Sequence, residues 1–446
     1  MPEQQCHGGI IIDEIKLSES LSLDHYGNVY GLVDLGQFSS SIASTSLADH
    51  ALVALFQPLT GKWHQVLGAF ASRGNVKADV LAKIIVEAVI MLENSFLRVD
   101  FVTTDAAAWN RSMWRSFGIS GKMHRVICKT VHPVHSRRHL HFISDFPHLI
   151  KNVRNCLLKH PFTTPEGTAS INHIRAAWAR DQQSSVTLKA MPRVHKAIVR
   201  PDGFEKMRVN YAFRLFSDEV RRGLFMYREE IQQRHGSATA TEVFIKRFQD
   251  LISIMTSRFP AAALRANSKN AQRVSEFLDY LDEWERTSEK NEFISASTAE
   301  GLRVTLSGTL SLLEYVTSKL GFRYLMTSRL SHDILEQVFG TPMPSPLPSM
   351  VSAVAFKSSV VALESISVTM QQMIYVMGQL NNKVKENTLS SKDFERRIRQ
   401  VQFGSHKRVD DEGSNPRIEE YRRINNTSDV SDTDNCEGRG MYVSNG

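Results

Sequence analysis

Four carboxylates in this sequence have the setting of ligands for a divalent metal ion. Asp13 follows the isoleucines of the run GIIIDEIKL, and Asp105 closes the apolar run VDFVTTD. Asp333 and Glu336 lie three residues apart in SRLSHDILEQVFG, so they share one face of the helix that this segment is expected to open. Carboxylate oxygens are hard ligands that suit Mg²⁺. Acids gathered around two ions can activate a water or a 3′-hydroxyl for attack on a phosphodiester and stabilise the leaving oxygen.

The same pattern has a plain alternative. A single aspartate at the end of a strand is more often a turn or capping residue. Composition and spacing alone therefore predict an α/β domain with a candidate metal site, on the condition that the acids converge at one edge of a sheet.

The elements that must position these acids form a mixed α/β pattern. Short apolar runs rich in β-branched residues favour buried strands. Apolar residues at three- and four-residue spacing predict a helix over 76–96, with Asn75 as its cap. The other expected elements are a strand at 9–17, a hairpin within 21–35, strands at 51–59 and 124–131, a strand that begins at 99 and ends near Asp105, and a strand followed by a helix within 139–158. This order predicts a mixed sheet.

The second half of the chain changes character. From about 160 to 330 it consists mainly of amphipathic blocks, which predict a helical insertion or a second domain. TPMPSPLPSM (341–350) holds four prolines and is expected to be a linker. One more helix is expected within 355–400, and a disordered tail from about 403.

Composition excludes several classes of protein. No run of 18 apolar residues occurs, so we expect no membrane span and no membrane partner. None of the four cysteines lies two to four residues from another, which argues against a zinc finger and a disulfide framework. The net charge of +7 gives modest support to a polyanionic partner. The chain opens almost directly into a strand, which is typical of a fragment or a shortened gene model.

Several basic and aromatic side chains have two interpretations each. Lys151, Arg154 and Lys159 lie on one expected helix, where they either touch DNA phosphate or form a solvated face. Tryptophans at 109, 114 and 178 are expected in the core rather than stacked on bases. The histidines at 132, 135, 139 and 141 are expected in loops and strands rather than in a zinc site. For His148 we expect packing beneath the acids, without an assigned chemical role.

Longer blocks carry a family resemblance. TTDAAAWNRSMWRSFGI (103–119), SDFPHLIKNVRNCLL (144–158) and YLMTSRLSHDILEQVFG (324–340) resemble the P-element transposase family, which includes the THAP-domain-containing transposase-like proteins. KMRVNYAFRLFSDEVRRGL and IKRFQDLISIMTSRF resemble parts of that family's insertion domain. The blocks occur in family order over roughly residues 9 to 340.

The resemblance implies a ribonuclease-H-like mixed sheet interrupted by a mostly α-helical insertion. It also implies roles for the acids: Asp13 matches the first catalytic Asp, Asp105 the second and Glu336 the catalytic Glu, with Asp333 as its neighbouring acid. Asp13, Asp105 and Glu336 would then bind Mg²⁺ or Mn²⁺. The implied activity is cleavage at transposon ends and strand transfer into target DNA, by a nuclear enzyme that can be a homo-oligomer.

Other properties follow from the resemblance alone. GTP binding in the insertion is one of them, because no G-x-x-x-x-G-K-[ST] phosphate loop occurs. No zinc-binding THAP module precedes residue 9. A domesticated or truncated, catalytically inactive nucleic-acid-binding remnant is therefore the alternative to an active transposase core. The expected domains are a first core part at 1–158, the insertion at 159–322, a segment completing the core at 323–340, a Pro-rich linker at 341–354, a helical segment at 355–402 and a disordered tail at 403–446.

Overall fold

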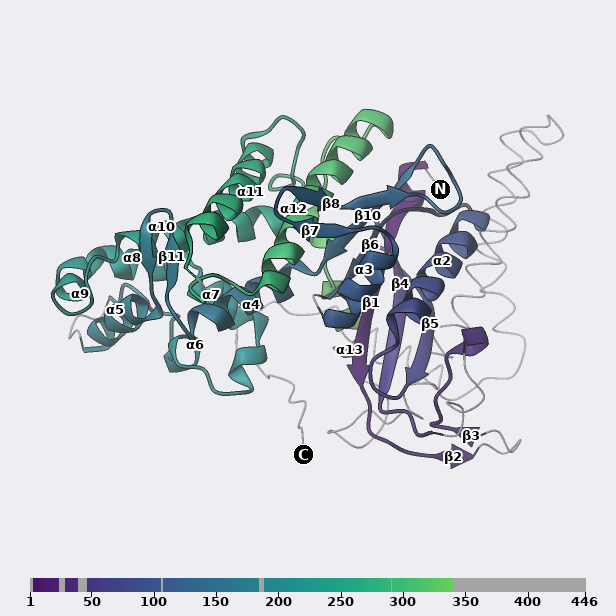
Figure 1. Cartoon of the computed structure of the whole chain (residues 1–446), viewed down its shortest axis with the longest axis horizontal. Coiled ribbons are helices and arrows are strands. Elements are labelled where there is room, and N and C mark those ends of the chain that lie inside the picture. Colours follow the sequence, from purple (N-terminus) through teal and green to yellow (C-terminus); the bar gives the residue numbers. More distant parts are fainter. Residues whose placement is uncertain are drawn as a thin grey trace, which may run out of the picture.

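A computed structural model describes residues 3–23, 29–38, 46–105, 107–183, 188–289 and 291–340 of the protein. Figure 1 shows two parts: a core built on a β-sheet, and a mostly helical part that extends away from one side of it. The predicted linker, helix and tail between 341 and 446 lie outside the described residues.

The core is a six-stranded mixed sheet with the strand order β5-β4-β1-β6-β10-β9. Three neighbouring strands, β1, β6 and β10, run parallel, while β4, β5 and β9 run antiparallel to their neighbours. The bounds are β1 (His7–Lys16), β4 (His50–Pro58), β5 (Gln65–Ser72), β6 (Arg98–Thr104), β9 (Lys129–Val131) and β10 (His139–Ser144).

The alternation of side chains along β1 divides the core into two layers. Ile10 and Ile12 pack on one face of the sheet, against α2 (Ala78–Asn94) and α3 (Ala108–Ser116). Ile11 packs on the other face, against α4 (Phe146–Leu157). Both faces are covered, which explains why β1 is an uninterrupted apolar run rather than an alternating one.

Short elements surround the sheet. They are α1 (Glu3–Cys6), the pair β2 (Ser22–Leu23) and β3 (Val29–Tyr30), η1 (Gly36–Phe38), and the pair β7 (Ser120–Lys122) and β8 (Arg125–Ile127). The hairpin predicted within 21–35 corresponds to β2 and β3. The predicted cap of α2 is wrong: the helix is preceded by Lys77, and no side chain caps it.

The helical part begins after α4. Its aromatic core includes Phe244, Phe248 and Trp284, which contact one another in a chain of ring pairs. Its elements are β11 (Phe162–Thr164), β12 (Gly167–Ala169), α5 (Ile171–Gln183), α6 (Lys196–Val199), η3 (Glu205–Met207), α7 (Val209–Leu215), α8 (Asp218–Met226), α9 (Arg228–His235), α10 (Thr239–Met255) and α11 (Lys269–Thr287).

The longest described helix, α12 (Ala296–Lys319), returns the chain to the core. Thr305 bonds both backbone groups of Ser144 at the end of β10, at 2.9 and 3.1 Å. The chain then passes through η4 (Thr327–Leu330) into α13 (Asp333–Gly340). The domain boundaries at 158 and 322 remain predictions, and α12 shows that part of the range 159–322 packs on the sheet.

The predicted fold class is confirmed as a mixed α/β sheet with a helical insertion. Among the described residues, none of the helices has both the length and the apolar character needed to cross a membrane.

Candidate functional site

Three aspartates lie at one edge of the sheet, at the carboxyl ends of its three parallel strands. Asp105 directly follows β6, and Asp145 directly follows β10, whose last residue pairs with the last residue of β6. Asp13 lies two residues beyond Ile11, which forms the last β1–β6 pair with Thr103, and Asp105 lies two residues beyond Thr103. The parallel register therefore brings acids from distant parts of the sequence to one edge.

Asp13 and Asp105 line the same pocket, which has a volume of about 220 Å³. Asp105 is held by the backbone N–H of Ala107 (2.8 Å) and the side-chain amide of Asn110 (2.5 Å). Burial raises the pKa of the Asp13 carboxyl above its usual range, and the negative charge of Asp105 adds to this, while nearby histidines oppose it. A cation between the two carboxylates would relieve their mutual repulsion.

Glu14 is a third acid in this pocket. Burial raises its pKa to about 7, although the backbone N–H of Val76 donates to its carboxylate at 3.2 Å. His50 and Trp109 also line the pocket, so Trp109 is not confined to the core as expected, whereas Trp114 is buried there.

Asp145 connects two segments that are far apart in the sequence. One carboxylate oxygen accepts from the backbone N–H of His148, at the start of α4 (3.0 Å). The other accepts from the backbone N–H of His332, just before α13 (2.8 Å). Asp145 is 2% exposed, and it had no role in the sequence-based prediction. The signal was present, because Asp145 follows a strand just as Asp105 does.

His332 lies between the acids of this edge. It is 1% exposed, and its Nδ1 lies 3.6 Å from Oδ2 of Asp13. Burial alone would lower the pKa of His332, but the negative charges of Asp13 and Asp145 outweigh it and raise the pKa. The ring of His148 contacts that of His332 edge-on, with centroids 6.0 Å apart. The ring of His148 thus packs on that of His332.

The two acids of α13 have different surroundings. Partial desolvation of the Glu336 carboxyl, together with the charges of Asp145, Asp333 and Asp13, raises its pKa. Glu336 is therefore within electrostatic range of Asp13, although it does not line the pocket. Asp333 instead forms an ion pair with Arg258, which follows α10 in the insertion (2.6 Å).

The basic residues of α4 also separate. Lys151 is half-buried, and burial lowers the pKa of its ammonium group against the attraction of Asp145, Asp105 and Glu336. Arg154 is fully buried and donates to the backbone carbonyl of Lys206 (2.6 Å), so it does not face DNA or solvent as expected. Of the predicted basic face, Lys151 is the residue whose pKa the carboxylates of the site influence.

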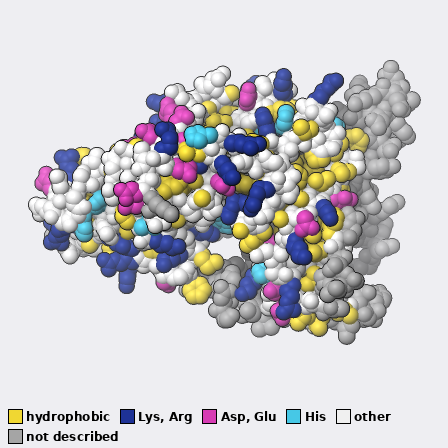
Figure 2. All heavy atoms as spheres, in the orientation of Figure 1, with side chains coloured by type: hydrophobic (Ala, Val, Ile, Leu, Met, Phe, Trp, Pro, Cys, Tyr) yellow, Lys and Arg dark blue, Asp and Glu magenta, His cyan; other side chains and the backbone are white. Residues whose placement is uncertain are grey.

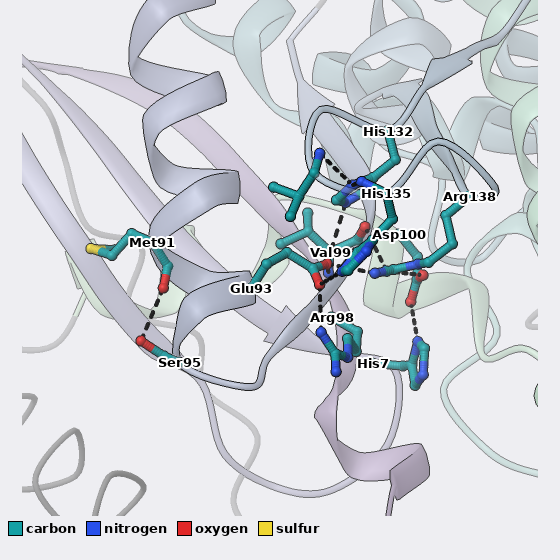
Figure 3. Close-up of polar contacts among 11 residues, drawn as sticks. His7, Met91, Glu93, Ser95, Arg98, Val99, Asp100, His132, His135 and Arg138 are labelled. Atoms are coloured by element: carbon teal, nitrogen blue, oxygen red, sulfur yellow. Dashed lines mark hydrogen bonds and ion pairs between the residues drawn. The ribbon is translucent and has the colours of Figure 1, made fainter. Parts of the chain in front are cut away.

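A buried ion-pair cluster lies towards the amino-terminal ends of the parallel strands, around Glu93 and Asp100 (Figure 3). Its contacts are Glu93 with Arg98 (2.8 Å), Arg138 (2.7 Å), His135 (3.1 Å) and His132 (3.3 Å), and Asp100 with Arg138 (2.9 Å) and His7 (2.7 Å). These contacts give His132 and His135 structural roles. Within the part of the chain that the structure describes, the histidines from 132 to 141 do not form a metal-binding group.

Two family models match this chain. Residues 1–118 match the TNP-like ribonuclease H N-terminal domain, and residues 147–269 match the TNP-like GTP-binding insertion domain. The first match contains Asp13 and Asp105, and the second begins at α4.

Curated proteins show the same relationship. The Transposable element P transposase of Drosophila melanogaster is 23% identical over 303 residues, which are 66% of this chain and 38% of the relative. The DNA transposase THAP9 of Homo sapiens is 24% identical over 354 residues, 75% of this chain and 38% of the relative. The chain thus spans well under half the length of both relatives.

A solved structure shares the fold. The Drosophila P element transposase strand transfer complex superimposes with a TM-score of 0.63 at 19% identity, covering 76% of this chain and 72% of that one. The likeness extends over both the sheet and the helical part, because the covered share exceeds either part alone.

Proposed function

We propose, from the premise that this chain belongs to the P-element-type transposase family, that it catalyses metal-dependent cleavage and strand transfer of DNA. The observation that carries the proposal is the meeting of Asp13 and Asp105 in one pocket at the carboxyl ends of adjacent parallel strands. Glu336, 323 positions after Asp13, lies within electrostatic range of that carboxylate.

The donor set fits Mg²⁺ or Mn²⁺. Asp13 and Asp105 offer carboxylate oxygens on one pocket, and Glu336 of α13, outside the lining of that pocket, would have to approach to add a third carboxylate. Mg²⁺ needs only one or two protein carboxylates, since water and phosphate oxygens complete its octahedron. A divalent ion bound there would activate the attacking hydroxyl and neutralise charge on the phosphate.

The surrounding residues position these groups. Asn110 and the backbone of Ala107 fix the Asp105 carboxylate, and Asp145 fixes the start of the helix that carries Glu336. Lys151 supplies a positive charge beside the acids, suited to a DNA phosphate. Figure 2 shows Lys and Arg side chains over the middle of the face in view and over the insertion.

The test uses the purified chain, a short DNA duplex and Mg²⁺ or Mn²⁺. We expect nicking or joining by the wild type and a loss of at least about 100-fold in Asp105→Asn, typical of removing a group that stabilises transition-state charge. Asp279→Asn is the control, because Asp279 is exposed on α11 in the insertion. Glu336→Gln should lose more activity than Asp333→Asn, because Arg258 already engages Asp333.

One outcome would reverse the conclusion. If the folded wild type binds DNA but cleaves no more than Asp105→Asn, the protein is an inactive nucleic-acid-binding remnant. Circular dichroism of both proteins must first confirm that they are equally folded.

We also propose that the insertion binds GTP. The match of residues 147–269 to a GTP-binding insertion domain supports this. Titration calorimetry of the chain with GTP should give saturable heat, with ATP as the comparison. No heat at millimolar GTP would remove the proposal.

Nuclear localisation and self-association complete the proposal, because DNA is the expected substrate and paired transposon ends require paired active sites. A fluorescent fusion should accumulate in the nucleus, and light scattering with DNA should report a mass above that of one chain.

A further inference from the structure

We propose that Asp145, His148 and His332 form a transition-metal site of the zinc type, next to the carboxylate pocket that Asp13 lines. One ligand atom from each residue lies within 4.8 Å of the other two. The residues come from the end of β10, the first turn of α4 and the residue before α13. This site goes beyond the proposed DNA chemistry, since it would exist without substrate.

The state of His332 is the second observation. The residue is 1% exposed, and neither ring nitrogen has a hydrogen-bond partner among the described residues. Leaving buried polar atoms without partners is costly, and such groups in native proteins are usually satisfied by water, an ion or a ligand. A metal ion bound to one ring nitrogen of His332 would give that nitrogen the partner that no described residue provides.

The ligand types select the metal. Two imidazole nitrogens and one carboxylate are typical of zinc and its neighbours in the transition series, whereas Mg²⁺ requires oxygen ligands. Each oxygen of Asp145 accepts one backbone N–H, which leaves lone pairs free for a metal. Tetrahedral bonds of about 2.0–2.1 Å place ligand atoms about 3.4 Å apart. The three ligand atoms now lie within 4.8 Å of one another, so each pair must approach by about 1.4 Å at most.

The orientation of His332 links this site to the pocket. Nδ1 lies 3.6 Å from Asp13, so a metal bond through Nε2 would leave this contact in place. A histidine that binds metal through one nitrogen commonly directs the other towards a carboxylate, which fixes both groups. The metal would thus hold α13 against α4 and orient Asp13, with water as a fourth ligand.

The competing interpretation is a protonated His332 that pairs with Asp13 and Asp145 without metal. The two interpretations differ in metal content. The full chain is purified without an immobilised-metal resin and dialysed against a weak chelator, and zinc is measured by mass spectrometry. We expect about one zinc per chain in the wild type and in His139→Gln, whose residue is exposed at the start of β10. His148→Gln should retain less than a tenth of that amount.

A second measurement does not depend on a variant that folds. Wild type reconstituted with Co²⁺ should show the visible absorption of tetrahedral cobalt, and zinc should abolish it. Added zinc should also raise the melting temperature of the wild type and His139→Gln, but not of His148→Gln. No cobalt absorption, or equal zinc in the wild type and His148→Gln, would overturn the metal site and favour the imidazolium. DNA is absent throughout, so these results are independent of the proposed cleavage activity.

Discussion

Replacing Asp145 by alanine should loosen the attachment of α13 to the core. The carboxylate caps α4 through the N–H of His148, and losing such a cap costs about 1 kcal/mol. It also accepts the buried N–H of His332, and leaving a buried donor unsatisfied costs about 1–3 kcal/mol. Asp145→Ala should therefore lower the free energy of unfolding by about 2–4 kcal/mol.

Asparagine at this position provides the matched comparison. Its carbonyl oxygen replaces one of the two acceptors, while its NH₂ group faces the second backbone N–H and cannot accept from it. Asp145→Asn should therefore lose about half as much stability as Asp145→Ala. Urea denaturation at pH 7 with a chelator present measures both variants without any contribution from bound metal.

Hydrogen exchange locates the effect. Protection of the His332 amide and of the first turn of α13 should fall in Asp145→Ala more than protection of the β1 amides. The explanation fails if Asp145→Ala stays within about 0.5 kcal/mol of the wild type. It also fails if stability falls while exchange at His332 is unchanged, because the loss would then arise in α4 alone.

Three further predictions test the core. Burial lowers the pKa of His141 to about 4, so its stabilising contribution is complete above an unfolded pKa of about 6.5 and is lost as the pH falls towards 4. The loss should reach about 3 kcal/mol by urea denaturation, from about 1.4 kcal/mol per pKa unit, and His141→Gln should lack this pH dependence. Glu93→Gln should cost about 1.5–3 kcal/mol at pH 7, because the charged hydrogen bonds of the buried carboxylate with Arg98 and Arg138 are lost. Hydrogen bonds outweigh burial and lower the pKa of Glu93, so this difference should shrink in thermal melts below about pH 4. Gly308→Ala should destabilise by about 1–3 kcal/mol in urea, because its Cβ would lie 2.7 Å from the carbonyl oxygen of Phe142. Gly203→Ala, with no atom near its Cβ among the described residues, should change stability by less than about 0.5 kcal/mol.

Local sequence patterns predict the central strands well. The apolar runs that end near Asp13 and Asp105 are strands, and the parallel register brings these two acids together as expected. The helices α2 and α4 were also predicted, because each has one apolar face on the sheet and one face in solvent.

Two elements escaped prediction for physical reasons. α12 is buried on most of its surface, including polar residues such as Thr305, so it has no clear polar face to produce a helical pattern. β5 contains Gly68 and is only partly buried, so its alternation is weak. A pattern method depends on a contrast between buried and exposed positions, and both elements lack it.

The environment of the acids was less predictable than the acids themselves. Nothing near Asp145 in the sequence indicates that His332 will donate to it, because 187 positions separate them. The ion pair of Asp333 with Arg258 is equally non-local. Such contacts follow from how the insertion returns to the sheet, which short-range spacing does not encode.

The long separation between Asp145 and His332 also matters while the protein is being made. The ribosome adds about 5–20 residues per second, so about 10–40 seconds pass between synthesis of the two positions. During that time the nascent sheet lacks α12 and α13, and its carboxylate edge has no closing segment. The core can therefore be completed only after residues 296–340 have emerged from the exit tunnel.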